Sequence, residues 1–395
     1  MPWRNMVGNR WVEIDTDAIR HNYQQIKELL ADNVHVLAVV KADAYGFGAV
    51  PVAQVLEECG ASMLGVTTVD EGIELREGGV TLPILLFSPF LSEEAALIFQ
   101  YDLTPAVSQM EQIRALAEAA GNQPVKIHLK IETGMGRTGL LSTEVIPFLE
   151  ELKQYPEIEV EGVFTHFAKA CAGDAYTKKQ FAVFQQVIQA MEEKGVKARY
   201  IHACNSAATL DLPEMHCNMV RVGTVLFGQN PALAKQKLEL KDPWQVKTRI
   251  IHIKKINQGT SVGYGREYIA KKETRIGVIP LGWADGLTVM PAIKPKNLLD
   301  LAKMMAKLVL EYFGQGKQST IVLGEKKYAL IGRLGMQLSM VELDASVEVG
   351  DEAQVVIRRL STNPRLPRVY FREGQAYRAR LAGRVIELNA QHLTL

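Results

Sequence analysis

Apolar residues in the first part of the chain gather in short runs that alternate with amphipathic stretches. Eight runs are predicted as strands, at 34–40, 62–67, 83–87, 103–107, 125–131, 158–164, 198–203 and 219–222. Several of them lack alternating polar positions, as strands buried on both faces should. Helical patterns lie between them, for example at 108–120 and 175–194. Eight strand–helix units within roughly 250 residues predict an α/β fold, a closed parallel (β/α)8 barrel.

The pattern changes after about residue 245. Short apolar runs separated by glycine turns predict strands within 248–256, 274–282, 328–335 and 353–360. One helical pattern, at 297–313, interrupts these predicted strands. It contains several charged residues, which argue against a membrane-spanning helix. We expect this helix to pack on the β-rich domain or on a partner subunit. The predicted domains are therefore a barrel at 12–243 and a β-rich domain at 244–395, which residues 1–11 could join.

Composition narrows the class of function. A length of 395 residues favours two domains, and a net charge of +1 gives no field that would attract nucleic acid or an acidic membrane. The first residues lack the apolar segment of a secretory signal. Four scattered cysteines, Cys59, Cys171, Cys204 and Cys217, form no C-x-x-C pair and are interpreted as reduced thiols. We expect a cytoplasmic protein that acts on a small molecule and has no metal site.

Residues suited to catalysis or anion binding lie at the ends of five of the predicted barrel strands. In strand order they are Lys41 and Tyr45, then Arg137, then His166, then Asn205 and Ser206, and finally Arg221, Gly223 and Thr224. Catalytic groups of a βα barrel collect where the strands end, on its C-terminal face. The sequence therefore predicts one shared pocket at that face.

Each residue type also has a plain structural alternative. Lys41 suits a Schiff base if its amine can lose its proton, but a lysine at a strand end is commonly only solvated. Ser206 and the Gly223–Thr224 turn could bind an anion, or could cap a helix and turn the chain. Arg221 could simply pair with a buried acid, and Tyr264 could be an ordinary strand tyrosine.

Seven motifs in a fixed order resemble one known family. They are VVKADAYGFG (39–48), KIETGMGR (130–137), FTHFA (164–168), NSAA (205–208), MVRVG (219–223), VGYGREY (262–268) and IPLGWADG (279–286). In this order and approximate spacing they resemble the alanine racemases, and the resemblance runs from about residue 10 to residue 383. It implies an enzyme that depends on pyridoxal 5′-phosphate.

The resemblance assigns the cofactor contacts. Lys41 matches the lysine that holds the cofactor as a Schiff base, and Arg221 matches the arginine that faces its ring nitrogen. Because a guanidinium cannot accept a proton, that nitrogen should stay neutral, which weakens the electron sink and discourages transamination. The remaining cofactor-binding positions of the family match Tyr45, His166, Asn205, Ser206, Gly223 and Thr224.

Racemisation calls for a base on each face of the substrate α-carbon. The resemblance makes Lys41 one base and Tyr264 the other, supplied by the neighbouring subunit of a homodimer, with His166 as its polariser. Arg137 matches an arginine that meets the cofactor's phenolate oxygen and the substrate carboxylate. Met336 matches a methionine whose backbone N–H contacts substrate across the dimer. Lys130 matches a lysine that is carbamylated in many members, although its motif here reads K-I-E-T rather than K-[IVL]-D-T.

Four departures fall where the family shapes the substrate entrance. The usual C-M-D-Q is Gly335-Met336-Gln337-Leu338, and Trp283 replaces an entrance tyrosine. Pro364 stands where a tyrosine contacts the phosphate, and proline has no N–H to donate. The 297–313 helix is an apparent insertion. Substrate choice is therefore the least constrained feature of the sequence.

Four hypotheses follow from these features. The first is a racemase that interconverts L- and D-alanine for the cell wall, and the second is a racemase for serine or a larger amino acid. The third is a decarboxylase on the same scaffold, which its lack of cysteines after residue 217 disfavours. The fourth is a non-catalytic cofactor-binding protein, although related barrels of that kind lack a second domain.

Overall fold

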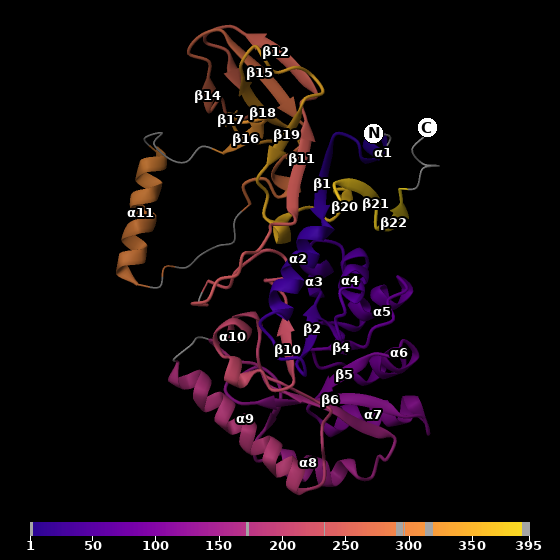
Figure 1. The fold of residues 1–395 in the computed structure, drawn as a ribbon. Helices are drawn as coiled ribbons and strands as arrows, with labels where there is room; N and C mark the ends of the chain where they lie inside the picture. The colour runs from indigo at the N-terminus through magenta and orange to yellow at the C-terminus, as the bar shows by residue number, and fades with distance from the viewer. Residues whose placement is uncertain are drawn as a thin grey trace. The chain divides into compact units, whose positions relative to one another are not determined.

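The computed structural model describes residues 3–170, 174–232, 234–289, 295, 297–312 and 319–388. Two compact units divide the chain, namely Asp15–Pro243, and Met1–Ile14 together with Trp244–Leu395 (Figure 1). We call them the barrel unit and the β unit. Cys171 lies outside the described residues.

Eight parallel strands of the barrel unit close on themselves. They are β2 (His35–Val39), β3 (Met63–Val66), β4 (Ile84–Leu86), β5 (Thr104–Val107), β6 (Val125–Glu132), β8 (Ile158–Phe164), β9 (Tyr200–His202) and β10 (Met219–Val222). Neighbours in this order pair with each other, and β10 pairs with β2 to close the ring. The short β7 (Leu140–Leu141) adds to β6. The predicted barrel is confirmed, because each of the eight apolar runs coincides with one of these strands to within two residues at either end.

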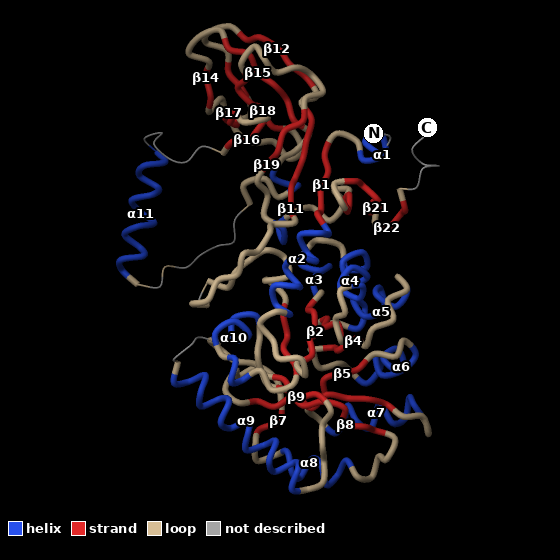
Figure 2. Tube along the Cα trace, in the orientation of Figure 1, coloured by secondary structure: helices blue, strands red, loops and turns tan. Residues whose placement is uncertain are grey.

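Helices lie outside the strands of this unit, as Figure 2 shows in blue and red. They are α2 (Thr16–Lys27), α4 (Ala49–Glu58), α5 (Val69–Glu77), α6 (Ala95–Gln100), α7 (Met110–Ala120), α8 (Val145–Leu152), α9 (Ala175–Glu193) and α10 (Ser206–Asp211). Helix α7 buries Ile113, Leu116 and Ala120, which recur at helical spacing. Helix α9 begins where the Asp174 carboxylate accepts a hydrogen bond from the Thr177 N–H.

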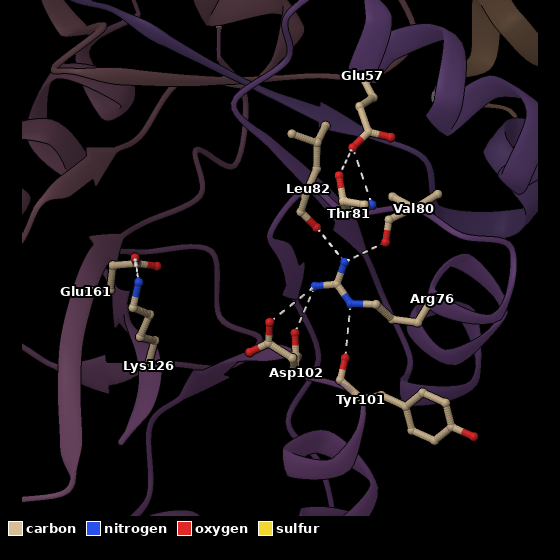
Figure 3. Close-up of polar contacts among 9 residues, drawn as sticks. All are labelled: Glu57, Arg76, Val80, Thr81, Leu82, Tyr101, Asp102, Lys126 and Glu161. Atoms are coloured by element: carbon tan, nitrogen blue, oxygen red, sulfur yellow. Dashed lines mark hydrogen bonds and ion pairs between the residues drawn. The ribbon is translucent and has the colours of Figure 1, made fainter. Parts of the chain in front are cut away.

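Arg76 on α5 fixes the connections that lead into β4 and β5 (Figure 3). Its guanidinium donates to the carbonyl oxygens of Val80 (2.9 Å) and Leu82 (2.7 Å), and to those of Tyr101 (3.0 Å) and Asp102 (2.9 Å). Loop carbonyls that would otherwise lack a partner are thus satisfied by one side chain. This network holds α5 and two barrel strands in a fixed relation.

The β unit is an 11-stranded sheet with a separate two-stranded hairpin. The sheet order is β12-β15-β18-β17-β16-β19-β11-β1-β20-β21-β22. Its strands are β1 (Arg10–Asp15), β11 (Trp244–Arg249), β12 (His252–Ile256), β15 (Thr274–Ile279), β16 (Thr320–Leu323), β17 (Lys326–Ile331), β18 (Ser339–Leu343), β19 (Glu352–Val355), β20 (Arg368–Arg372), β21 (Gln375–Leu381) and β22 (Arg384–Glu387). The hairpin pairs β13 (Ser261–Val262) with β14 (Tyr268–Ile269). The predicted β-rich domain is confirmed in class.

Strand β1 is an element that our sequence analysis did not predict. It pairs antiparallel with β11, and Figure 1 shows the two side by side. Its residues Trp11, Val12 and Ile14 are fully buried. Helix α1 (Trp3–Val7) adds Trp3 and Val7 to the same core. The chain therefore starts within the β unit before it enters the barrel unit.

The helix predicted at 297–313 is α11, Leu298–Tyr312, and Phe313 lies outside the described residues. Its apolar side chains are exposed in the single chain, with Leu298 at 83% and Leu308 at 63% of full exposure. Within the described ranges, no helix combines the length and apolar character needed to cross a bilayer.

Candidate active site

The barrel residues predicted as site residues line one cavity of about 340 Å³. These are Lys41, Tyr45, Lys130, Arg137, His166, Asn205, Ser206, Arg221, Gly223 and Thr224. They come from the ends of β2, β6, β8, β9 and β10, so the cavity opens at the C-terminal ends of the strands. The volume falls in the range of small-molecule sites.

Lys41 begins an unusual turn, α3 (Lys41–Tyr45), directly after β2. Four consecutive non-glycine residues, Ala42 to Tyr45, have φ between 50° and 57°. This left-handed conformation costs an L-residue about 1–2 kcal/mol. Lys41 is exposed in the single chain, although it follows the buried apolar strand β2.

Two carboxylates support this left-handed turn. Glu71 on α5 accepts hydrogen bonds from the N–H groups of Ala42 (2.6 Å) and Thr67 (2.7 Å). Asp43 within the turn accepts from Ala49 N–H (2.8 Å) at the start of α4. The strained backbone is thus held by contacts on both sides, which fixes the direction in which Lys41 leaves the barrel.

A cradle of hydroxyl and backbone groups lies beside the turn. Ser206 Oγ accepts from the Gly223 N–H at 3.1 Å, while Asn205 caps α10 by accepting from Ala207 and Ala208. Capping is therefore the role of Asn205, and the Ser206 hydroxyl can still donate. A Cβ at Gly223 would lie 2.4 Å from the Tyr45 hydroxyl, so a larger residue here would require the Tyr45 side chain to shift.

Arg221 on β10 is buried, and its four terminal N–H groups face five acceptors, so that one N–H is shared between two of them. Its NH1 reaches His202 Nδ1 and His202 O, both at 3.0 Å. Its NH2 reaches Thr165 O (2.8 Å), Ala203 O (3.0 Å) and His166 Nδ1 (3.3 Å). Burial lowers the pKa of this guanidinium to about 10, so it remains charged at neutral pH.

The structural alternative for Arg221, a pair with a buried acid, is not observed among the described residues. Among the described residues, no carboxylate lies within ion-pair distance of its guanidinium. Its Nε–H likewise has no hydrogen-bond partner in the described part of the chain, and Arg221 lines the cavity. A buried cation with a remaining donor at a cavity can serve a neutral acceptor such as a ring nitrogen.

His166 has its protonation defined by Arg221. A guanidinium only donates, so His166 Nδ1 must accept and the ring proton must sit on Nε2. Burial and the charges of Arg221 and Arg137 lower the pKa of His166 to about 3. The ring is therefore neutral and presents an N–H donor from Nε2.

Lys130 and Arg137 frame the loop after β6. Lys130 is buried and donates to Phe87 O at 3.0 Å. Burial and the charges of Arg137 and Arg221 lower its pKa to about 8. Glu132 accepts from the N–H groups of Gly136 (2.9 Å) and Arg137 (3.2 Å), so the glutamate of K-I-E-T organises the loop that carries Arg137.

Tyr264 and Met336 lie in the β unit, where they line a second hollow of about 680 Å³. Tyr264 is 73% exposed and Met336 57% exposed. Within the described ranges, the Met336 N–H donates no hydrogen bond, while its carbonyl accepts from Ala284 at 3.0 Å. The structure thus brings these two predicted residues to one surface of the β unit.

Two of the departing positions also lie in this unit. Trp283 is 51% exposed in a short helical turn, Trp283–Asp285. Pro364 accepts a hydrogen bond from the buried Arg368 through its carbonyl oxygen (2.9 Å).

Sequence reasoning missed the buried polar residues beneath the cavity. His128, His202 and Glu161 are at most 4% exposed, and His202 contacts Arg221 directly. The available signal was a polar residue inside an apolar strand, as in V-K-I-H-L-K-I. It also missed the aromatic wall formed by Phe87 and Phe164.

Comparison with known proteins matches both units to one family. Residues 14–231 match the family described as Alanine racemase, N-terminal domain, and residues 244–368 match Alanine racemase, C-terminal domain. The chain belongs to the alanine racemase family. It is therefore an amino-acid racemase, as the seven motifs predicted.

Similar proteins cover nearly the whole chain. An alanine racemase of Clostridium tetani is 36% identical over 92% of this chain and 96% of its own length. The solved alanine racemase of Clostridium difficile 630 has a TM-score of 0.83 and 30% identity, covering 95% of this chain and 99% of that one. The Bacillus anthracis alanine racemase with bound L-Ala-P has a TM-score of 0.79 and 28% identity over 96% and 97% of the two chains.

Proposed function

We propose that this protein interconverts L- and D-alanine with pyridoxal 5′-phosphate as its cofactor. The observation that carries the proposal is the barrel cavity itself. Lys41, the cradle of Tyr45, Ser206, Gly223 and Thr224, and the acid-free Arg221 all line it. The related enzymes named as alanine racemases support alanine as the substrate.

The residues of the cavity fit the cofactor. Gly223 and the hydroxyls of Ser206 and Tyr45 form a cradle that a Cβ would fill, as a phosphate site needs. Lys41 supplies the primary amine that would hold the cofactor covalently, and the remaining Nε–H of Arg221 suits its ring nitrogen. When bound, the cofactor would draw electrons from the substrate α-carbon and make its hydrogen acidic.

Two bases would exchange that hydrogen. Lys41 serves one face of the α-carbon, and Tyr264 of a neighbouring subunit serves the other. The neutral His166 supports this role, because its Nε2–H can donate to the tyrosine oxygen when the phenol loses its proton. The exposure of Tyr264 in the single chain also supports a partner, since a residue that works in its own subunit's core would be enclosed.

The substrate carboxylate would be held by Arg137 and by the backbone N–H of Met336 from the neighbouring subunit. Arg137 lines the cavity and offers a planar pair of donors. Met336 offers a backbone N–H that is not used within the described ranges. A carbamate on Lys130 would orient Arg137 and balance its charge, which the lowered pKa of Lys130 favours.

A complementation experiment tests the shared site. Each of the variants Lys41→Ala and Tyr264→Phe should be nearly inactive as a homodimer. In a mixed dimer, one site carries both changes and the other carries neither. Random mixing should therefore restore roughly a quarter of the wild-type alanine racemisation, measured by chiral chromatography.

The result distinguishes a site shared between two subunits from a site formed within one chain. If Lys41 and Tyr264 of the same chain formed one site, every site in the mixture would keep one lesion and no activity would return. An equal mixture of Lys178→Ala and Tyr264→Phe is the matched control, because Lys178 is an exposed lysine of α9. A wild-type protein that racemises serine faster than alanine would overturn the substrate assignment.

A further inference from the structure

A chain of buried polar side chains runs inward from Arg221 through the barrel. Arg221 NH1 lies 3.0 Å from His202 Nδ1, and His202 Nε2 lies 2.9 Å from His128 Nδ1. His128 Nε2 in turn faces Glu161 Oε2 at 3.7 Å. Both histidines are fully buried. These side chains therefore connect the cavity residue Arg221 to the carboxylate of Glu161 on β8.

The far end of this chain reaches solvent through Lys126. Its ammonium lies 2.9 Å from Glu161 Oε1, and its side chain is half exposed (Figure 3). His128 and Lys126 hold the pKa of the Glu161 carboxyl at about 2, so the carboxylate is charged throughout the physiological range. Burial lowers the pKa of both His128 and His202.

Donor and acceptor roles in this chain follow from one fact, that a guanidinium can only donate. His202 must accept at Nδ1 and carry its proton on Nε2. That proton is donated to His128 Nδ1, so the proton of His128 must lie on Nε2. Nε2 has no hydrogen-bond partner within the described ranges and faces the Glu161 carboxylate, which can only accept, at 3.7 Å. Both rings are therefore neutral, and every N–H points away from the cavity.

The backbone is shaped for this arrangement. The β6–β8 register shifts between Ile127 and His128, a bulge that redirects a side chain. A Cβ on Gly162 would lie 2.5 Å from the His128 ring, so glycine is needed to admit it. The His202 ring stacks on Phe164 at 4.8 Å and 9°. The rings are thus fixed in place by packing as well as by hydrogen bonds.

We infer that Glu161 is a positioning residue for the racemase reaction, which acts through His128 and His202 to hold Arg221. A carboxylate admits only the N–H direction described above. An amide in its place could also donate to His128 Nε2, which would move the His128 proton to Nδ1. His202 would then carry its proton on Nδ1. This N–H donor would face the N–H donor of the Arg221 guanidinium, and the hydrogen bond between them would be lost. Replacing the Glu161 carboxylate by an amide would thereby weaken the hydrogen bonding that holds Arg221 at the cavity.

The inference depends on the proposed function in one respect, that Arg221 contacts the cofactor. Its first test does not depend on that. In full-length protein labelled with [15N]histidine, His128 and His202 should both appear as neutral Nε2–H tautomers, with and without pyridoxal phosphate. Substitution of each ring by glutamine assigns the signals. A charged or Nδ1–H ring at either position would overturn the inference, whatever the enzyme catalyses.

The second test compares Glu161→Gln with Glu159→Gln. Glu159 is an exposed acid on the same strand and acts on the same Lys126. Glu161→Gln should shift the His128 and His202 signals toward the Nδ1–H form and speed pyridoxal-phosphate release about tenfold, the effect of losing roughly one hydrogen bond. Glu159→Gln should change neither. Identical spectra and release rates for the two variants would refute the role of Glu161, even if racemisation of alanine is confirmed.

Discussion

The two units prepare their functional residues in different ways. In the barrel unit, the terminal N–H groups of Arg221 contact five acceptors, and His166 and Lys130 are held beside it with lowered pKa values. In the β unit, Tyr264 and Met336 are more than half exposed. The Tyr264 hydroxyl has no hydrogen-bond partner in the part of the chain that is described.

This difference suggests that the two units have different functions. A site that must hold a cofactor needs groups fixed in advance, because their positions determine the electrostatics of the reaction. A residue supplied to another subunit is completed only by assembly, so exposure in the single chain is what its role requires. Loss of Lys41 from the barrel unit should therefore affect both cofactor binding and proton transfer, whereas loss of the Tyr264 hydroxyl from the β unit should affect proton transfer alone.

The largest effect is expected from Lys41→Ala. The amine is both the cofactor's covalent attachment and one of the two bases, so racemisation should fall by roughly ten-thousandfold or more. Absorbance of the purified protein should show that the cofactor is no longer covalently bound. Lys178→Ala should retain both properties, and a Lys41→Ala protein that still binds its cofactor covalently would place the attachment elsewhere.

The next largest effect is expected from Tyr264→Phe. Removing one general base should lower racemisation by about a hundredfold to ten-thousandfold while cofactor absorbance stays unchanged. Lys41 would still act on its own face of the α-carbon. One alanine enantiomer should therefore exchange its α-hydrogen for deuterium in heavy water without inverting, which mass spectrometry and chiral chromatography together can show. Exchange lost equally for both enantiomers would contradict the two-face assignment.

The barrel was predictable because its signals are local. Each strand is a short apolar run buried on both faces, and each polar residue at a strand end falls at the cavity by the geometry of the barrel. The β unit was less predictable. Strand β1 lies more than 200 residues from its neighbour β11, and no local pattern specifies such a partner.

The chain beneath Arg221 shows a second limit of sequence reasoning. His128 and Glu161 look like ordinary strand residues until the register of β6 and β8 places them together. The αL turn after Lys41 was also missed, because Ala42 and Ala44 carry none of the residue types that favour this conformation. Both features arise from tertiary contacts, which no single segment encodes.

A smaller effect is expected for carbamate formation at Lys130, which should depend on pH. Its pKa of about 8 means that the neutral amine, the form that adds carbon dioxide, grows as the pH rises from 7 to 9. The nearby guanidinium groups that disfavour the ammonium would favour a carbamate. Labelled bicarbonate should therefore give a carbamate signal in carbon NMR that strengthens with pH and is absent in Lys130→Ala. We expect that variant to lose about tenfold in activity, the scale of one positioning contact.

The smallest effect on stability is expected from a substitution in helix α11, because its apolar side chains are exposed in the single chain. Leu308 is 63% exposed, so Leu308→Ala should change the free energy of unfolding by no more than about 0.5 kcal/mol. Leu343 on β18 is 6% exposed, and Leu343→Ala should cost about 2–5 kcal/mol through the cavity it leaves. Denaturant unfolding of both variants measures the contrast. Equal losses would mean that α11 is packed in the assembled enzyme. A loss for Leu308→Ala that shrinks as the protein is diluted would identify the partner subunit as what it packs against, because dissociated subunits no longer make that contact.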